Sequence, residues 1–327
     1  MITGFIILIF ACLCQGSFGL GYKNYKPFSW ESFWGVYSLY CALVPLLWTV
    51  ILIPGFLPYL TAEPKATVTA ILCGVVWGIS AICFSKGVTM IGMSLVYGIS
   101  MGISAIVGSV IPLFTADSLP KLSSMLLLMS GLCGTLLGIF VITKAGLIKD
   151  KENNQQCNGS MKLGLIFSMI SGLGAGVMNV GFDSLSKVGN AVVANGYSDT
   201  TASAIQWLPV LFGGACAGMS YCAYSMTKNK TWKTYAMQGS VKRFAVLFLT
   251  AIVWFAALAA YGIASLKLGE LGPVVGWILF NAIALIVSNG WGLKVGEWRG
   301  CDKAKKVLFI GNGILIISWV ITALSNI

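Results

Sequence analysis

Long apolar runs alternate with short clusters of charged residues along all 327 positions of the chain. A helix needs about 20 mainly apolar residues to cross the hydrocarbon core of a bilayer. Runs of this length recur from one end of the chain to the other, at 2–21, 33–56, 67–85, 88–115, 122–143, 161–182, 203–226, 242–265, 271–293 and 307–325. The pattern predicts an all-α polytopic membrane protein with ten transmembrane helices in the lipid bilayer.

Small residues are frequent inside these runs. Gly98, Ser100 and Gly102 lie together in the fourth run, where we expect the helix to be broken. A break inside a bilayer needs support from neighbouring helices or a cavity, because every backbone group there must be paired. Glycines four residues apart, such as Gly172 and Gly176, also allow two helices to approach closely.

Composition leaves no room for a separate soluble domain. Charged residues make up only 9% of the chain and hydrophobic residues 57%, whereas about 25% of a soluble domain is charged. We expect one transmembrane domain, 1–327, with a first half at 1–143, a cytoplasmic loop at 144–160 and a second half at 161–327. Five helices in each half would give the halves opposite orientations. Such inverted repeats are typical of transporters that bind substrate near the middle of the membrane.

The positive charges are distributed unevenly between the predicted loops. Of the 21 Lys and Arg residues, 17 lie in or beside the loops that follow the first, third, fifth, seventh and ninth runs. The other loops hold only Lys65, Lys121, Lys187 and Lys267. Because cytoplasmic loops carry the excess of Lys and Arg, this pattern places both termini on the outer face. Topology thus accounts for the net charge of +11, and nucleic acid is not an expected partner.

Several functional classes lack the residues that they require. The chain has no histidine, so a proton-linked step would depend on carboxylates. No cofactor or metal is expected, and most of the ten cysteines lie in apolar runs, as small buried residues do. The HExxH motif and the phosphate-binding GxxxxGK[ST] motif are both missing. The pattern therefore favours a transporter over an enzyme, and a receptor or assembly protein is disfavoured because no extramembrane domain is present.

Short stretches distributed along the chain carry a family resemblance. They are Ser29-Trp30-Glu31 with Phe33-Trp34, Val76-Trp77-Gly78-Ile79, Ile91-Gly92-Met93-Ser94 and Val141-Ile142-Thr143-Lys144-Ala145-Gly146, with weaker matches at Met178-Asn179 and Glu297-Trp298. Together they resemble the L-rhamnose–proton symporter family of the drug/metabolite transporter superfamily. The resemblance implies a plasma (inner) membrane protein that imports L-rhamnose or a related sugar with a proton. The alternative is a transporter of the same superfamily that moves another small metabolite, including by export.

A monosaccharide site needs polar groups that match hydroxyls and flat apolar faces that cover the C–H surfaces. The predicted substrate-binding residues are Gln15, Trp77, Ser94, Tyr97, Asn179, Trp254, Trp277 and Asn281. Packing between helices is the alternative role for the tryptophans and asparagines. Trp30 and Trp34 lie at the end of a run, and we interpret them as part of an interfacial aromatic belt.

Few carboxylates are available for proton coupling. Asp183 lies at the outer end of the sixth run, four residues after Asn179 and therefore on the same helix face. We expect Asp183 to be the proton-coupling residue, with an ordinary helix-end residue as the alternative. Glu31 and Glu297 lie at the cytoplasmic end, where pairing with nearby Lys and Arg is favoured over a proton relay. The direction of transport and the oligomeric state are left open.

Overall fold

The computed structural model describes residues 2–22, 26–115, 120–153 and 159–325, and helices account for most of these residues. The helices are α1 (Ile2–Ser17), η1 (Phe18–Tyr22), α2 (Trp30–Leu52), α3 (Leu57–Ala62), α4 (Pro64–Ile91), α5 (Met93–Thr115), α6 (Leu122–Glu152), α7 (Met161–Asp183), α8 (Ser186–Ala194), α9 (Asp199–Asn229), η2 (Trp232–Ala236), α10 (Ser240–Leu268), α11 (Gly272–Lys294) and α12 (Asp302–Leu324). No strand occurs in the part of the chain that the structure describes, which confirms the all-α prediction.

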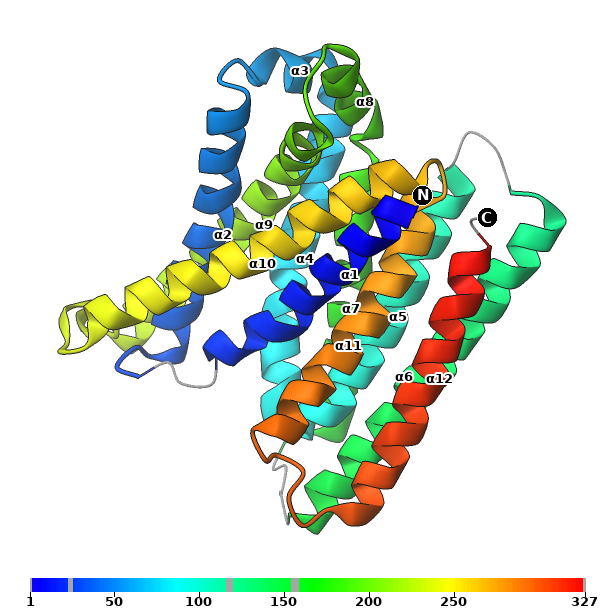
Figure 1. The fold of residues 1–327 in the computed structure, drawn as a ribbon. Helices are drawn as coiled ribbons and strands as arrows, with labels where there is room; N and C mark the ends of the chain where they lie inside the picture. Colours follow the sequence, from blue (N-terminus) through cyan, green and yellow to red (C-terminus); the bar gives the residue numbers. More distant parts are fainter. Residues whose placement is uncertain (1, 23–25, 116–119, 154–158, 326–327) are drawn as a thin grey trace.

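Ten helical segments among the described residues are long and apolar enough to cross a membrane. The short helices α3 and α8 lie together at one end of the bundle (Figure 1). Helix α6 continues to Glu152 and so includes the first residues of the loop expected at 144–160. Part of that loop, 154–158, lies outside the described residues.

The helix ends follow from local sequence. Ser29, Ser160 and Ser198 are N-caps whose hydroxyls accept hydrogen bonds from backbone N–H groups in the first turns of α2, α7 and α9. Gly92, with a φ of 85°, separates α4 from α5. The prediction of a break at Gly98–Gly102 was wrong, because α5 runs without interruption from Met93 to Thr115. Glycine interrupts the chain at Gly92, where a positive φ is needed.

The connections between helices lie at the two ends of the bundle. The connections α4–α5, α9–α10 and α11–α12 lie at one end, whereas the start of α1 and the end of α12 lie at the end that carries α3 and α8 (Figure 1). A Cβ added at Gly4 would lie 3.3 Å from Leu268 and Lys267, so the start of α1 packs beside the end of α10. The α9–α10 and α11–α12 connections hold Lys230, Lys233 and Arg299, and we call the end where they lie the lysine-rich end.

Small residues let several pairs of helices pack with their backbones in contact. A Cβ at Gly74 of α4 would collide with the carbonyl of Val210 in α9, and one at Gly78 with that of Gly214. A Cβ at Gly172 or Gly176 of α7 would lie 2.6 Å from a side chain of α5. Helix α9 is the most buried of the spans, with 78% of its apolar window inside the protein, and it forms the centre against which α2 and α4 pack.

Candidate functional site

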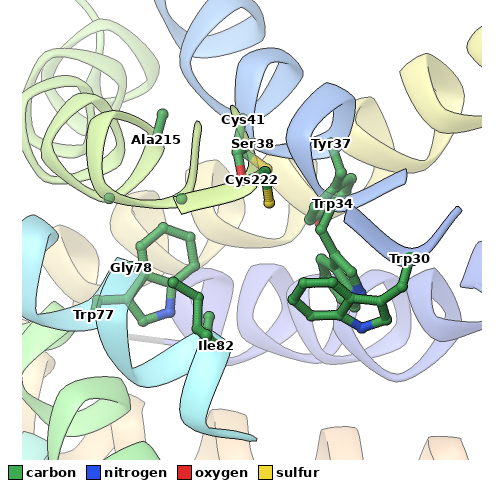
Figure 2. Close-up of a pocket in the computed structure, with 13 residues that line it drawn as sticks. Trp30, Trp34, Tyr37, Ser38, Cys41, Trp77, Gly78, Ile82, Ala215 and Cys222 are labelled. Carbon is green, nitrogen blue, oxygen red and sulfur yellow. The ribbon is translucent and has the colours of Figure 1, made fainter. Parts of the chain in front are cut away.

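A pocket lies between α2, α4 and α9. Figure 2 shows the Trp77 ring on one side of the space and the rings of Trp30 and Trp34 on the other. None of the 13 lining residues is charged. The pocket therefore suits a neutral ligand.

Aromatic rings form much of the pocket wall. The indoles of Trp77 and Trp254 are stacked, with centroids 5.4 Å apart and an interplanar angle of 11°. Tyr37 contacts Trp254 at 6.2 Å and Trp34 at 5.7 Å. Trp254 is not in the lining and supports Trp77 from behind. Rigid aromatic faces of this kind can cover the C–H surface of a sugar ring.

The remaining wall is built from small residues and a few polar groups. Helix α9 contributes Gly214, Ala215, Gly218 and Cys222. The hydroxyl groups of Ser38 and Tyr37 come from α2. The pocket thus combines an aromatic face, a backbone-lined face and a small number of hydrogen-bonding groups, which is the composition typical of a small-molecule site.

Three contacts join the helices at the lysine-rich end of the pocket. The Trp30 Nε1–H donates a hydrogen bond of 2.7 Å to Ser85 Oγ, which bridges α2 and α4. These two helices are not otherwise closely packed. The Trp30 ring also meets Tyr221 of α9 edge-on at 6.3 Å, and Lys86 Nζ lies 5.0 Å from the centre of the Tyr221 ring. The pocket is therefore bridged at this end.

Glu31 adds a polar connection beside this bridge. Its side chain is only 7% exposed, and Oε1 accepts hydrogen bonds from Asn229 Nδ2 at 3.1 Å and Thr231 Oγ1 at 2.8 Å. We expected Glu31 to pair with Lys or Arg, but none of the ion pairs among the described residues involves Glu31. These two donors are neutral groups on the last residue of α9 and in the turn that follows it, and the Ser29 side chain at the start of α2 also hydrogen-bonds Glu31.

Neighbouring hydroxyl groups extend the same contact between α2 and η2. Thr234 Oγ1 donates to Ser32 Oγ at 2.8 Å, and Tyr235 OH donates to the Ser32 carbonyl at 3.0 Å. Burial raises the pKa of the Tyr235 phenol to about 12, and the nearby Cys222 thiol adds to this effect. Tyr235 therefore remains a protonated donor at physiological pH.

A second buried polar cluster joins four helices at some distance from the pocket wall. Asn179 of α7 is fully buried, and its Nδ2 donates to the carbonyls of Gly108 at 2.7 Å and Pro273 at 3.1 Å. Its Oδ1 accepts a hydrogen bond of 2.6 Å from the Tyr261 hydroxyl. Through these three hydrogen bonds, Asn179 connects α7 to α5, α10 and α11.

The comparison with known protein families adds a direct assignment. The family model for the L-rhamnose-proton symport protein (RhaT) matches residues 1–326. The chain belongs to this family. Similar proteins include an L-rhamnose-proton symporter of Yersinia pestis (strain Pestoides F) and one of Yersinia pseudotuberculosis serotype O:1b (strain IP 31758). Each is 26% identical to this chain, over 97% of the chain and 95% of the relative.

Membership in the RhaT family confirms the resemblance seen in the sequence. It also makes the protein a multi-pass membrane transport protein and not an enzyme. The match extends through the second half of the chain, where the short motifs are weaker.

The structure brings only some of the predicted site residues together. Trp77 lines the pocket and Trp254 stacks on it. Trp277 Nε1 donates to the carbonyl of Ser104, and Asn281 Nδ2 donates to the Trp277 carbonyl in its own helix. With Asn179, these two residues belong to the α5–α7–α10–α11 region and lie outside the pocket lining.

The other predicted residues are dispersed. Ser94 packs closely against α6, because a Cβ added at Gly146 would collide with its side chain. The Tyr97 ring contacts Phe84 edge-on at 6.1 Å. Gln15 Oε1 is buried in α1 and has no hydrogen-bond partner among the described residues. Asp183 is half-buried at the end of α7, where Ser186 Oγ donates to Oδ1 at 3.2 Å. These assignments stay predictions.

One face of α2 was missed by interpretation of the sequence. Trp30, Trp34, Tyr37, Ser38 and Cys41 all line the pocket. Their spacing of three to four residues is the signature of a single helix face. Treating Trp30 and Trp34 only as span-end tryptophans concealed this periodicity.

Proposed function

We propose that this RhaT family member imports L-rhamnose or a closely related monosaccharide together with a proton. The observation that carries the proposal is the uncharged, aromatic pocket between α2, α4 and α9. One face of the sugar would stack on Trp77, which Trp254 holds in place. Ser38 and Tyr37 would supply hydrogen bonds, and the small residues of α9 would leave room for the ring.

The same proposal includes an orientation and an architecture. We place the protein in the plasma (inner) membrane, with both termini on the periplasmic face and the lysine-rich end in the cytoplasm. An inverted repeat would relate α1, α2, α4, α5 and α6 to α7, α9, α10, α11 and α12. The helix packing supports this relation, because α4–α7 then corresponds to α1–α10, α5–α7 to α1–α11, and α4–α9 to α2–α10. Such a repeat is suited to alternating access.

Transport by purified protein in liposomes would test the function. We expect an inward proton gradient to drive accumulation of L-rhamnose above its external concentration, and dissipation of the gradient by a protonophore to abolish accumulation. A panel of deoxyhexoses and hexoses should compete according to their fit to the pocket. Uptake that is saturable but indifferent to the gradient would remove proton coupling. Failure to bind or move any sugar would favour another small metabolite, including one that is exported.

We propose Asp183 as the carboxylate that takes up the proton from the outer side. It lies one helical turn beyond Asn179, and its charge acts on Tyr261, the phenol that donates to Asn179. Tyr261 lies two turns from Trp254 on the same face of α10, which gives a route toward the pocket. Protonation and sugar binding together would then favour closure of the outer side.

Replacing Asp183 with asparagine should abolish proton-driven accumulation but preserve exchange of labelled for unlabelled sugar. Asparagine keeps the size of the side chain but cannot carry the exchangeable charge. Asp199→Asn is a matched control, because Asp199 is another outer-end aspartate and forms an ion pair of 2.5 Å with Lys267. Accumulation that persists in Asp183→Asn at the wild-type level would exclude Asp183 from coupling.

A further inference from the structure

We propose that Glu31 is a proton-controlled latch that holds the cytoplasmic end of the pocket closed. In this proposal the ionised carboxylate ties α2 to the end of α9, and its protonation releases that tie so that the pocket opens to the cytoplasm. The inference rests on the proposed function for the identity of the sugar. The contacts that carry it, however, are independent of which sugar is transported.

The tie between α2 and α9 consists of one charged acceptor and two neutral donors, and Ser29, the N-cap of α2 itself, also hydrogen-bonds the carboxylate. Glu31 Oε1 accepts from Asn229 Nδ2 at 3.1 Å and from Thr231 Oγ1 at 2.8 Å. Hydrogen bonds to an ionised carboxylate are about twice as strong as those between neutral groups. Protonation would therefore weaken both bonds at once.

The groups that face Glu31 differ between the elements packed around α2. Helix α9 contributes the Cys222 thiol and η2 contributes the Tyr235 phenol, both of which lie in the electric field of the carboxylate. The side chains of Lys228 on α9, Lys230 in the turn after it, Lys233 on η2 and Lys242 on α10 are exposed. Arg243 on α10 is partly buried, and its Nε donates to the Lys26 carbonyl. On α4, Lys86 lies over the Tyr221 ring.

The position of Glu31 explains how release of one tie could open the pocket. The adjacent residue Trp30 bridges to Ser85 on α4, while Glu31 holds α9, so the first turn of α2 connects both other walls. Trp30 and Trp34 on the same stretch line the pocket itself. Movement of this turn away from α9 would therefore displace part of the lining and the Trp30–Ser85 bridge together.

The proposed cycle moves one proton inward with each sugar. In this cycle the proton that Asp183 takes up on the outer side is passed on, through the substrate pathway, to the Glu31 carboxylate, which becomes the neutral acid. The tie to α9 weakens, and the pocket opens to the cytoplasm. Glu31 then loses the proton to cytoplasmic water, and the ionised carboxylate re-forms the bonds to Asn229 and Thr231. One proton is thus moved inward with the sugar in each cycle.

Glu31→Gln tests the latch because glutamine has the size of the carboxyl group without its charge. Inside-out vesicles would be treated with a membrane-impermeant maleimide at fixed pH. Peptide mass spectrometry would then measure the rate at which Cys41 is labelled. Cys41 lines the pocket and is preferred to Cys222, whose thiol responds directly to the Glu31 charge. We expect labelling to become about tenfold faster, equivalent to a loss of about 1.4 kcal/mol from the closed state. Sugar exchange should persist while proton-driven accumulation is lost.

Two further variants separate a latch from a general structural role. Glu297→Gln removes a carboxylate at the same end of the molecule, in the turn between α11 and α12, and should leave both readouts unchanged. Asn229→Leu removes one donor but keeps the titrating carboxylate. It should speed Cys41 labelling and leave accumulation dependent on the proton gradient, and it provides the labelling test even if Glu31→Gln fails to fold.

The outcomes are distinct from those of the proposed function. Wild-type labelling rates in both Glu31→Gln and Asn229→Leu would overturn the latch. Wild-type accumulation by Glu31→Gln would overturn its role in coupling. If the unmodified protein carries no sugar, the proposed function fails, but the Cys41 labelling rates still decide whether Glu31 closes the pocket.

Discussion

Replacing Trp77 with alanine is expected to reduce the kcat/KM of sugar uptake by about 100-fold. Trp77 is the ring that both lines the pocket and stacks on Trp254, with only 11° between the two planes. Truncation of an aromatic anchor in a binding site typically costs about 2 kcal/mol or more of binding free energy, and about 2.7 kcal/mol corresponds to a factor of 100. Initial rates of labelled sugar uptake into proteoliposomes would measure the loss.

Trp48→Ala is the matched control for this prediction. Trp48 lies on α2, the helix that carries much of the pocket wall, but its side chain is 45% exposed and it does not line the pocket. Trp77→Phe should restore part of the activity because it keeps a flat aromatic face. If Trp77→Ala transports sugar as well as the Trp48 variant does, the pocket between α2, α4 and α9 is not the sugar site.

Replacing Asn179 with leucine is expected to destabilise the helix bundle by about 2 kcal/mol. Three hydrogen bonds, to Gly108, Pro273 and Tyr261, depend on this fully buried amide. Interhelical hydrogen bonds in membrane proteins contribute about 0.6 kcal/mol each on average. Leucine has a similar volume, so the loss reports mainly on the polar contacts. Thermal unfolding of the purified protein in detergent would measure the change in stability.

Tyr261→Phe allows the Asn179 effect to be partitioned. It removes the hydroxyl that donates to Asn179 Oδ1 at 2.6 Å, and the double variant should be less destabilised than the two single variants added together. The KM for sugar in Asn179→Leu should change little if the amide only joins helices. A large rise in KM with unchanged stability would instead make Asn179 a direct substrate contact, as its sequence position predicted.

The sequence predicted the spans and the class of protein. These features depend on local composition, because a spanning helix is recognised from its own apolar length and a loop from its own charges. Trp77 and Trp254 were predicted to bind substrate. The structure places Trp77 in the pocket lining with Trp254 stacked on it, and their role in binding stays a prediction. The prediction of a break at Gly98–Gly102 was wrong because these glycines serve packing between helices. Helix α5 stays continuous, and the missing side chain at Gly98 leaves room for Thr143 of α6.

The arrangement of the site required long-range information. Glu31 and Asn229 are 198 positions apart, and Trp30 and Ser85 are 55 apart. No local pattern indicates which helices become neighbours, so the Trp30–Ser85 bridge and the partners of Glu31 were not predictable. Asn179 illustrates the same limit, because a buried amide can serve a ligand or a set of backbone carbonyls, and only the packing decides between them.

The close packing of α4 against α9 has a consequence for changing the range of sugars that the protein accepts. Much of the wall that these helices contribute consists of glycine and alanine, and at Gly74, Gly78 and Gly214 a larger residue would collide with the facing helix. Selectivity is therefore most easily altered on α2, where Trp34, Ser38 and Cys41 point into the same space. Directed evolution toward bulkier or less methylated sugars should enrich substitutions at these three positions and leave the glycines untouched.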